Sequence, residues 1–341
     1  MASNVRNDKT ARLAPETALR LGYTLGRQAG QRAGRVLALP AAAELLPARS
    51  GGSGRRARRA PLAAVISARD EELTIAEAVR AAGATPGVTR VVVVANGCRD
   101  ATAIAARRAG AEVIEYVEPL GHDVGRALGA AALPGHDLLL LDGDFALRPE
   151  ELRRFVVALR RDVDVVLNDQ NPVYAARSRV GTVTLMRLLL NRLLGRPDLG
   201  VNSLLIVPAG LSARAVRCIG PAALAVPPLA QAKAIMSGLR ICAVPGVDVL
   251  ARNRRRPGLN AGSGLTPLEL LIIGDHLEAI DYILKRRGPR GGYSDLDRKR
   301  LLLERIVAQQ EPSDGAERAR PLSVTAESDK MAAEHQHLLR R

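Results

Sequence analysis

The chain has 341 residues, 47% of them hydrophobic, which is enough for one large or two ordinary buried cores and excludes disorder throughout. Two Phe, five Tyr and no Trp are too few for aromatic platforms that stack single-stranded bases or line long oligosaccharide grooves. The formal charge of +15 is uneven, since residues 1–60 carry +9 and residues 61–341 only +6. This concentration in one segment argues against a nucleic-acid partner for the remainder of the chain.

The cysteines and the apolar runs indicate a cellular location. Cys98, Cys218 and Cys242 have neither the spacing of a zinc site nor the even number of a disulfide framework, which predicts a reducing cytoplasm. No apolar run reaches the roughly 18 residues that span a bilayer, so we expect any membrane contact to be peripheral.

Residues 1–60 are poor in large hydrophobic side chains and end in the run Gly51-Gly52-Ser53-Gly54-Arg55-Arg56. That composition is typical of a linker, and we predict a basic, flexible tail before a domain that begins near Pro61. Glycines recur in this tail at positions 22, 26, 30 and 34, interspersed with arginines.

From Leu62 onward short apolar runs alternate with segments of helical periodicity, a pattern typical of βαβ units around a mostly parallel sheet. The apolar runs predict strands over Leu62–Ala68, Arg90–Ala95, Glu112–Tyr116, Asp137–Leu141 and Val163–Leu167. Apolar residues spaced by three and four predict helices over Thr74–Ala82, Asp100–Ala109, Val124–Leu133 and Glu150–Arg160. The sequence therefore predicts an α/β domain over residues 61–250.

The second half of the chain is less regular. It predicts helices over Val180–Leu194 and Leu229–Ser237, and strands over Ser203–Val207 and Arg240–Val244. Residues 251–310 are predicted to form a helical extension with a long helix over Pro267–Arg286, and the polar residues 311–341 a disordered tail.

The strongest local signal is the run Leu138-Leu139-Leu140-Leu141-Asp142-Gly143-Asp144. It places two carboxylates just beyond a buried strand, at the edge where open α/β sheets bind ligands. With Gly143 loosening the backbone, Asp142 and Asp144 can converge on one hard divalent cation. A surface turn is the alternative for an Asp-Gly-Asp run alone.

Polar residues also follow the other predicted strands. The run Gly121-His122-Asp123-Val124-Gly125-Arg126 opens a helix, where free amides and the Arg126 guanidinium favour an anion such as a diphosphate. His122 either joins that site or caps the helix. Asp70 and Asp100 lie in the turns after the first two strands, and helix capping is the alternative to a functional role for both.

Taken in order, these segments resemble the family 2 glycosyltransferases of the GT-A fold, over about residues 61–250. Val65–Glu72 is similar to the family's first strand and its Asn-Glu turn, and Val91–Thr102 to its second strand and following turn. The run Leu141–Phe145, with Arg148-Pro149-Glu150 after it, is similar to the metal-binding motif of dolichyl-phosphate-mannose-synthase-like members. The fold implied is Rossmann-like, with a mixed, mostly parallel sheet flanked by helices.

The resemblance implies a metal-dependent enzyme that uses a nucleotide-diphosphate sugar, usually with inversion. Asp142 and Asp144 would hold Mg²⁺ or Mn²⁺, and Ser67, Arg69 and Glu71 would line the nucleotide pocket. Arg126 would stabilise charge on the departing diphosphate. Where many members have an Asp pair, this chain has Ala95-Asn96, so Asn96 is a partial substitute in nucleotide binding.

The sequence also departs from the family at the catalytic base. The stretch Ala225–Gln231 contains no carboxylate where many members carry Glu-Asp, which leaves Asp169 as the candidate base. A phosphate acceptor is already an anion and needs no base, and this condition fits a polyprenyl phosphate. The arginines of the run Arg252-Asn253-Arg254-Arg255-Arg256 either bind such a phosphate or an anionic bilayer, or form a solvated loop.

Two alternative functions remain open at the sequence level. A nucleotidyltransferase shares the layout but normally has a Gly-rich basic loop after its first strand, where this chain has Arg69-Asp70-Glu71-Glu72. A catalytically inactive GT-A protein that binds a membrane or nucleic acid through its basic tail is the other. The leading prediction is a glycosyltransferase whose acceptor is either a polyprenyl phosphate or an envelope glycan or glycolipid precursor.

Overall fold

The strand β1 (Leu62–Ala68) lies inside a seven-stranded sheet and is apolar along almost its whole length because both of its faces are covered. The computed structural model describes residues 59–176, 180–252 and 265–310. By its contacts the chain divides into a first unit that ends at Ile283 and a second that begins at Leu284. Most of the predicted tail 1–60, and all of the tail 311–341, lie outside the described residues.

The sheet has the strand order β3-β2-β1-β4-β6-β5-β7. All neighbouring strands pair in parallel except β6, which is antiparallel to both β4 and β5. This mixed, mostly parallel arrangement confirms the predicted GT-A fold. The remaining strands are β2 (Val88–Asn96), β3 (Glu112–Tyr116), β4 (Asp137–Asp142), β5 (Val165–Asp169), β6 (Ala209–Leu211) and β7 (Ile241–Pro245).

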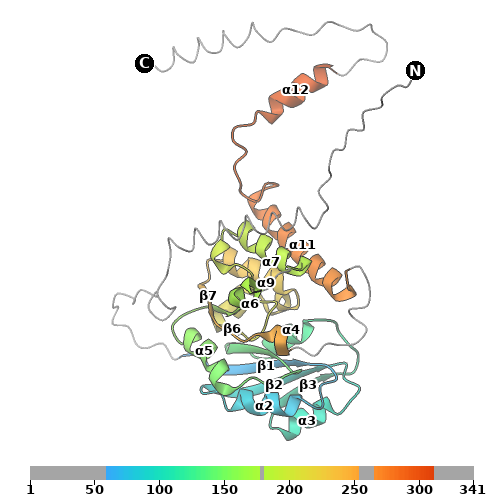
Figure 1. Cartoon of the computed structure of the whole chain (residues 1–341), viewed down its shortest axis with the longest axis vertical. Helices are drawn as coiled ribbons and strands as arrows, with labels where there is room; N and C mark the ends of the chain where they lie inside the picture. Colours follow the sequence, from blue (N-terminus) through green and yellow to red (C-terminus); the bar gives the residue numbers. More distant parts are fainter. Residues whose placement is uncertain (1–58, 177–179, 253–264, 311–341) are drawn as a thin grey trace, which may run out of the picture. The chain divides into compact units, whose positions relative to one another are not determined.

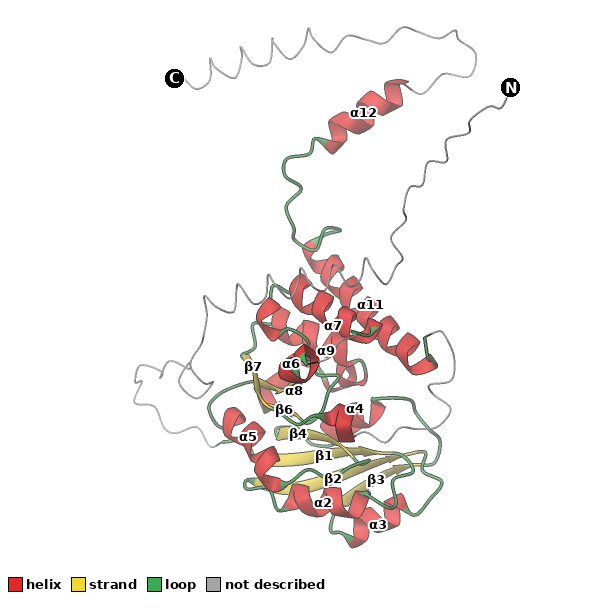
Figure 2. Cartoon of the chain, viewed as in Figure 1, coloured by secondary structure: helices red, strands yellow, loops and turns green. Residues whose placement is uncertain are grey.

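Helices cover both faces of this sheet (Figures 1 and 2). One face packs against α2 (Ile75–Gly83), α3 (Thr102–Arg108) and α5 (Pro149–Leu159), and the other against α4 (Val124–Ala131), α8 (Ala213–Ile219) and α9 (Pro227–Met236). Successive residues of β1 and β4 alternate between the two resulting cores, as the pleat of a strand requires. The other described helical segments of the first unit are α6 (Asn171–Ala175), α7 (Thr182–Leu193), α10 (Val249–Arg252) and the 3₁₀ turns η1 (Pro197–Leu199) and η2 (Pro221–Ala225).

Two glycines let α4 approach β1 unusually closely. A Cβ on Gly129 would lie 2.2 Å from Val65 Cγ1, and a Cβ on Gly125 would lie 2.8 Å from Ser67 Oγ. At either position a side chain would fit only if the contacting side chain of β1, the strand or the helix moved. The close packing places the N-terminus of α4 at the carboxyl ends of β1 and β4.

The predicted strand Ser203–Val207 is wrong, because these residues form turns and the strand in this region is β6. The backbone of this stretch is hydrogen-bonded by side chains instead of a neighbouring strand. Leu204 N–H donates to Gln231, and the carbonyls of Leu204 and Leu205 accept from Arg126. Helices α6, α8 and α10, the two 3₁₀ turns and a helix over Arg300–Gln310 were not predicted individually. The other described helices and strands, β6 aside, lie within a few residues of their predicted bounds.

The long predicted helix is α11 (Pro267–Arg287), whose first-unit residues pack on α7 and α9. Its Ala279 and Ile283 share an apolar cluster with Leu190, Leu194 and Ala232. Within the second unit, the helix α12 (Arg300–Gln310) exposes several leucines. Among the described helices, none combines the length and the apolar character needed to cross a bilayer.

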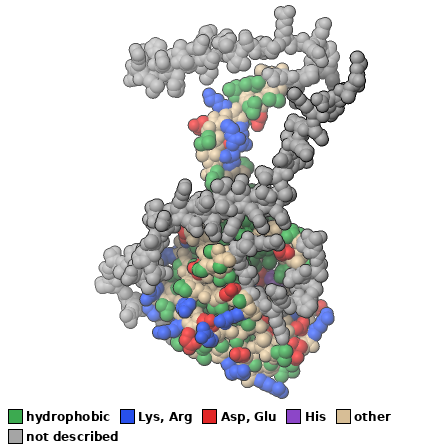
Figure 3. Space-filling model, viewed as in Figure 1, with side chains coloured by type: hydrophobic (Ala, Val, Ile, Leu, Met, Phe, Trp, Pro, Cys, Tyr) green, Lys and Arg blue, Asp and Glu red, His purple; other side chains and the backbone are tan. Residues whose placement is uncertain are grey.

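Charged side chains of both signs are interspersed over the face of the molecule seen in Figure 3. The described residues on this face therefore show no continuous basic stripe of the kind that tracks a nucleic-acid backbone.

Candidate active site

The turn Asp142-Gly143-Asp144 lies at the carboxyl end of β4 and is fixed to the neighbouring β1. Gly143 N–H donates to the Ser67 carbonyl (2.9 Å), and the Thr74 hydroxyl donates to the Gly143 carbonyl (2.7 Å). A Cβ on Gly143 would lie 3.1 Å from both Ala68 Cβ and Ile75 Cδ1, so a larger residue would require these neighbours to shift by a few tenths of an ångström. The two flanking carboxylates are hard oxygen ligands of the kind that Mg²⁺ and Mn²⁺ prefer, so the donor set fits such a cation.

Arg126 lies beside Asp142 with only 5% of its side chain exposed. Its Nη2 atom is 3.6 Å from Asp142 Oδ1 and 3.0 Å from Asp123 Oδ1. Desolvation opposes the charge on the guanidinium, but the two carboxylates outweigh it and hold the pKa of Arg126 above its ordinary value. The charge of this arginine is thus shared between two acids.

The Asp142 side chain is partly exposed to solvent, and protein surrounds the rest of it. Although 36% of its side chain is exposed, desolvation by the surrounding protein raises the pKa of Asp142 against the lowering effect of Arg126. A bound cation would reverse this effect, because positive charge favours the ionised carboxylate.

The turns that follow β1 and β2 are tied together by two aspartates. Asp70 accepts a hydrogen bond from Arg99 N–H (2.7 Å), and Asp100 accepts one from Glu72 N–H (3.0 Å) and one from Thr102 N–H (2.9 Å). Asp100 therefore satisfies an amide at the start of α3, in agreement with the capping alternative. One ligand atom from each of Asp70, Cys98 and Asp100 lies within 4.8 Å of the others.

The predicted nucleotide-binding residues all lie at this carboxyl edge, but they differ in exposure. Arg69 is exposed, whereas Glu71 is buried, with its N–H donating to the Thr102 hydroxyl (2.7 Å). Ser67 Oγ is covered and faces Gly125 of α4. The Asn96 carboxamide donates to the Gly121 carbonyl (2.9 Å) and accepts from Leu120 N–H (2.8 Å), so it fixes the loop before α4.

Asp169 ends β5, which is separated from β4 by β6. Its Oδ1 atom accepts hydrogen bonds from Asn202 Nδ2 (2.9 Å) and from Asn171 N–H (3.1 Å). Both bonds are made to the same oxygen, which fixes the orientation of the carboxylate. Asp169 and Asp142 therefore belong to the same edge of the sheet but to strands that are not adjacent.

A buried carboxamide network supports the loop that carries Asn202. Gln231 of α9, 1% exposed, accepts from Leu204 N–H (2.8 Å) and donates to Asn191 Oδ1 (2.6 Å). Asn191 in turn donates to the carbonyls of Gly200 and Asn202. The stretch Ala225–Gln231 contains no carboxylate. Its Gln231 instead provides an amide that holds the loop carrying Asn202, the residue bonded to Asp169.

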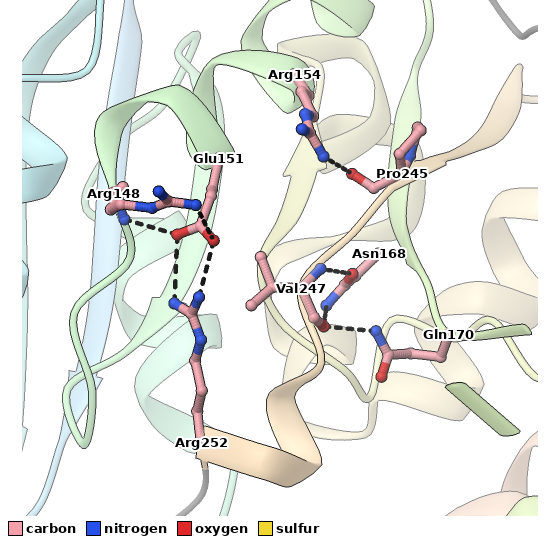
Figure 4. Close-up of polar contacts among 8 residues, drawn as sticks. All are labelled: Arg148, Glu151, Arg154, Asn168, Gln170, Pro245, Val247 and Arg252. Atoms are coloured by element: carbon pink, nitrogen blue, oxygen red, sulfur yellow. Dashed lines mark hydrogen bonds and ion pairs between the residues drawn. The ribbon is translucent and has the colours of Figure 1, made fainter. Parts of the chain in front are cut away.

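The segment after β7 is held against this edge at several points (Figure 4). Asn168 and Gln170 flank Asp169 in the sequence, and both donate to the Val247 carbonyl, while Val247 N–H donates back to Asn168 Oδ1 (2.9 Å). Five residues further on, Arg252 donates two hydrogen bonds to the Glu151 carboxylate on the first turn of α5. Residues 245–252, which we call the strap, therefore run from the end of β7, where they are bonded to β5, to the helix that follows the Asp142 turn.

The sequence predicts Arg126 and Asp169 as site residues, but it does not single out the residues that orient them or those that hold the neighbouring strap. Asp123 precedes Arg126 by three positions, a spacing at which opposite charges meet on a helix, and this signal was present in the sequence. Glu151 and Asn168 gave no comparable signal, because their partners are 101 and 79 residues away.

Comparisons with known proteins find one family model and several solved structures that this chain resembles. Residues 63–194 match the family model described as Glycosyl transferase family 2, and a search of curated proteins finds no match. Among solved structures, glucosyl-3-phosphoglycerate synthase from Mycobacterium tuberculosis in complex with uridine diphosphate is 23% identical, with a TM-score of 0.49 over 69% of this chain and 82% of that chain. The same synthase with Mn²⁺, UDP-glucose and phosphoglyceric acid is 22% identical, with a TM-score of 0.48 over 69% and 81%.

Proposed function

Because residues 63–194 belong to glycosyltransferase family 2, we propose that the chain transfers a sugar from a nucleotide-diphosphate donor in a reaction that depends on a divalent cation. The observation that carries this proposal is the turn Asp142-Gly143-Asp144 at the carboxyl end of β4, fixed to β1 by the Gly143 hydrogen bond. Open α/β sheets bind their ligands at this edge.

The described residues have distinct parts in this reaction. Asp142 and Asp144 would hold Mg²⁺ or Mn²⁺, which supplies positive charge against the diphosphate when bound. Arg126 lies close enough to Asp142 to add a second, fixed positive charge to the site. Arg69, exposed beyond β1, is available to the nucleotide, and Glu71 and Asn96 keep the surrounding turns in place.

Asp169 is the proposed base for an acceptor that must lose a proton. Its orientation is fixed by Asn202, and a general base must be held within hydrogen-bonding reach of the proton that it removes. The acceptor class that we propose first is a phosphate, of which a polyprenyl phosphate is one example, since α9 offers no carboxylate at the usual position of the base. With such an acceptor there is no hydroxyl proton for Asp169 to remove.

The donor is tested by thermal shift, in which nucleotide sugars are titrated with and without Mn²⁺. A bound ligand raises the unfolding temperature according to its occupancy, and we expect one donor to do so only when Mn²⁺ is present. Asp142→Asn and Asp144→Asn should remain folded and lose this response, whereas Asp162→Asn, in the turn before β5, should keep it. No metal-dependent response to any common donor would contradict the proposal.

The reaction and acceptor are tested by product analysis. Release of nucleoside diphosphate upon addition of a polyprenyl phosphate would support transfer to a phosphate. Release only with a soluble sugar or glycerate acceptor would contradict the proposed phosphate acceptor. Formation of pyrophosphate from a nucleoside triphosphate and a sugar phosphate would indicate the nucleotidyltransferase alternative instead.

A further inference from the structure

Asp123 is a buried acid beside the candidate metal site that the proposed function does not use. It lies at the N-terminal boundary of α4 with φ of 58°, and only 4% of its side chain is exposed. Its Oδ1 atom is paired with Arg126, while its Oδ2 atom is buried without a hydrogen-bond partner in the part of the chain that the structure describes. His122 Nε2 lies 3.7 Å from Oδ2.

The two acids compete for the same atom of Arg126. Nη2 lies 3.0 Å from Asp123 Oδ1 and 3.6 Å from Asp142 Oδ1, so Asp123 is the closer partner. The other terminal nitrogen, Nη1, is directed to the carbonyls of Leu204 and Leu205, and these bonds prevent the guanidinium from moving away from both acids. Arg126 is therefore fixed between one acid that faces the site and one that does not.

We propose that Asp123 is a positioning residue that takes up the charge of Arg126, so that the Asp142 carboxylate remains available to a divalent cation. This inference rests on the proposed metal site. With Asp123 present, one guanidinium serves two carboxylates and the group keeps a net negative charge, which attracts a cation. Without it, Arg126 would pair with Asp142 alone, and the site that the cation must enter would carry one negative charge fewer.

The test is Mn²⁺ binding to the full-length protein without nucleotide, measured by electron paramagnetic resonance or calorimetry. We expect Asp123→Asn to raise the Kd for Mn²⁺ by about 10-fold to 100-fold, the usual cost of removing a residue that acts through a metal ligand. Asp162→Asn is a matched control, because Asp162 also has a positive φ (61°) but is exposed in the turn after α5. It should leave the Kd unchanged.

Two further variants separate this role from a structural one. Asp123→Glu keeps the charge and should bind Mn²⁺ within about 3-fold of the wild type. In an Arg126→Gln background, Asp123→Asn should have little further effect on the Kd, because the charge that it controls is gone. Circular dichroism identifies any variant that does not fold, and Asp123→Glu keeps the proposal testable if Arg126→Gln fails.

The outcomes distinguish this inference from the function on which it rests. Equal Mn²⁺ affinity of the wild type and Asp123→Asn would overturn the role of Asp123 and leave the metal site intact. An equal loss with and without Arg126 would show that Asp123 does not act through that arginine. Failure of the wild type to bind Mn²⁺ would overturn the proposed metal site and this inference with it.

Discussion

The Glu151 carboxylate accepts two hydrogen bonds from the Arg252 guanidinium, 2.8 and 3.3 Å long, across 101 residues of sequence. It also accepts one from Arg148 N–H (2.9 Å) at the start of α5. Desolvation raises the pKa of Glu151, but these hydrogen bonds outweigh it and hold the pKa below the ordinary value of 4.5. One carboxylate therefore fixes both the helix after the Asp142 turn and the far end of the strap.

Replacing this carboxylate should release the strap. Glu151→Gln is expected to cost about 2 kcal/mol, since hydrogen bonds to charged groups are lost while their donors remain. That corresponds to a fall in Tm of roughly 4–8 °C for a unit of this size, with faster amide exchange in residues 245–252. Because the folded pKa is lowered, the difference should be largest above pH 4.5 and shrink as the pH falls. Glu150→Gln, exposed next to it, is the control, and an equal effect of both variants would contradict the assignment.

The other end of the strap depends on Gly246. A Cβ at this position would lie 1.6 Å from Asn168 Oδ1, the atom that accepts from Val247 N–H. Gly246→Ala is therefore expected to destabilise the fold by about 2–4 kcal/mol, through overpacking and loss of a buried hydrogen bond.

Urea unfolding measures the change in stability caused by Gly246→Ala. The control is a second Gly→Ala substitution that should change the stability in the opposite direction. Gly274 lies within α11 and an added Cβ would meet nothing within 4 Å, so Gly274→Ala should stabilise the helix by about 0.5–1 kcal/mol. If Gly246→Ala were neutral, the contact between the strap and β5 would be incorrect.

The role of Asp169 depends on the acceptor. With a hydroxyl acceptor, Asp169→Asn should lower kcat by about 10²-fold to 10⁴-fold, the usual contribution of a general base, with little change in donor KM. With a phosphate acceptor the loss should be small, because there is no proton to remove. Steady-state kinetics on both classes checks this, and Asp162→Asn is again the control. A large loss with the phosphate acceptor would indicate another role for Asp169.

Asp275 of α11 makes the stability of the first unit depend on pH. Desolvation, followed by the charges of Asp123 and Glu278, raises its pKa from 3.8 to about 6. A raised carboxyl pKa contributes stability at low pH that is lost as the pH rises to about 6, where the folded state must ionise the group.

Asp275→Asn removes this penalty and should raise the Tm at pH 7.5. The gain is about 1 kcal/mol or 2–4 °C once solvent screening of a half-exposed group is allowed for. It should shrink as the pH is lowered toward 4. Differential scanning fluorimetry across this range checks the prediction, and a gain that does not vary with pH would contradict it.

The sequence by itself determined the α/β class, because a strand buried on both faces must be apolar throughout and a covering helix must be apolar at every third or fourth position. It also located Asp142 and Asp144, since the end of an apolar run marks the edge of the sheet where ligands bind. Neither inference needs knowledge of distant contacts.

Only the tertiary structure decided how the charges at that edge are paired and how its loops are held. Arg126 reaches Leu204 across 78 residues, Asn168 reaches Val247 across 79, and Glu151 reaches Arg252 across 101. The stretch 203–207 has the composition of a strand, but side chains from elsewhere satisfy its backbone and leave it as turns. Such bonds depend on which segments the folded chain brings together, and local periodicity carries no record of that.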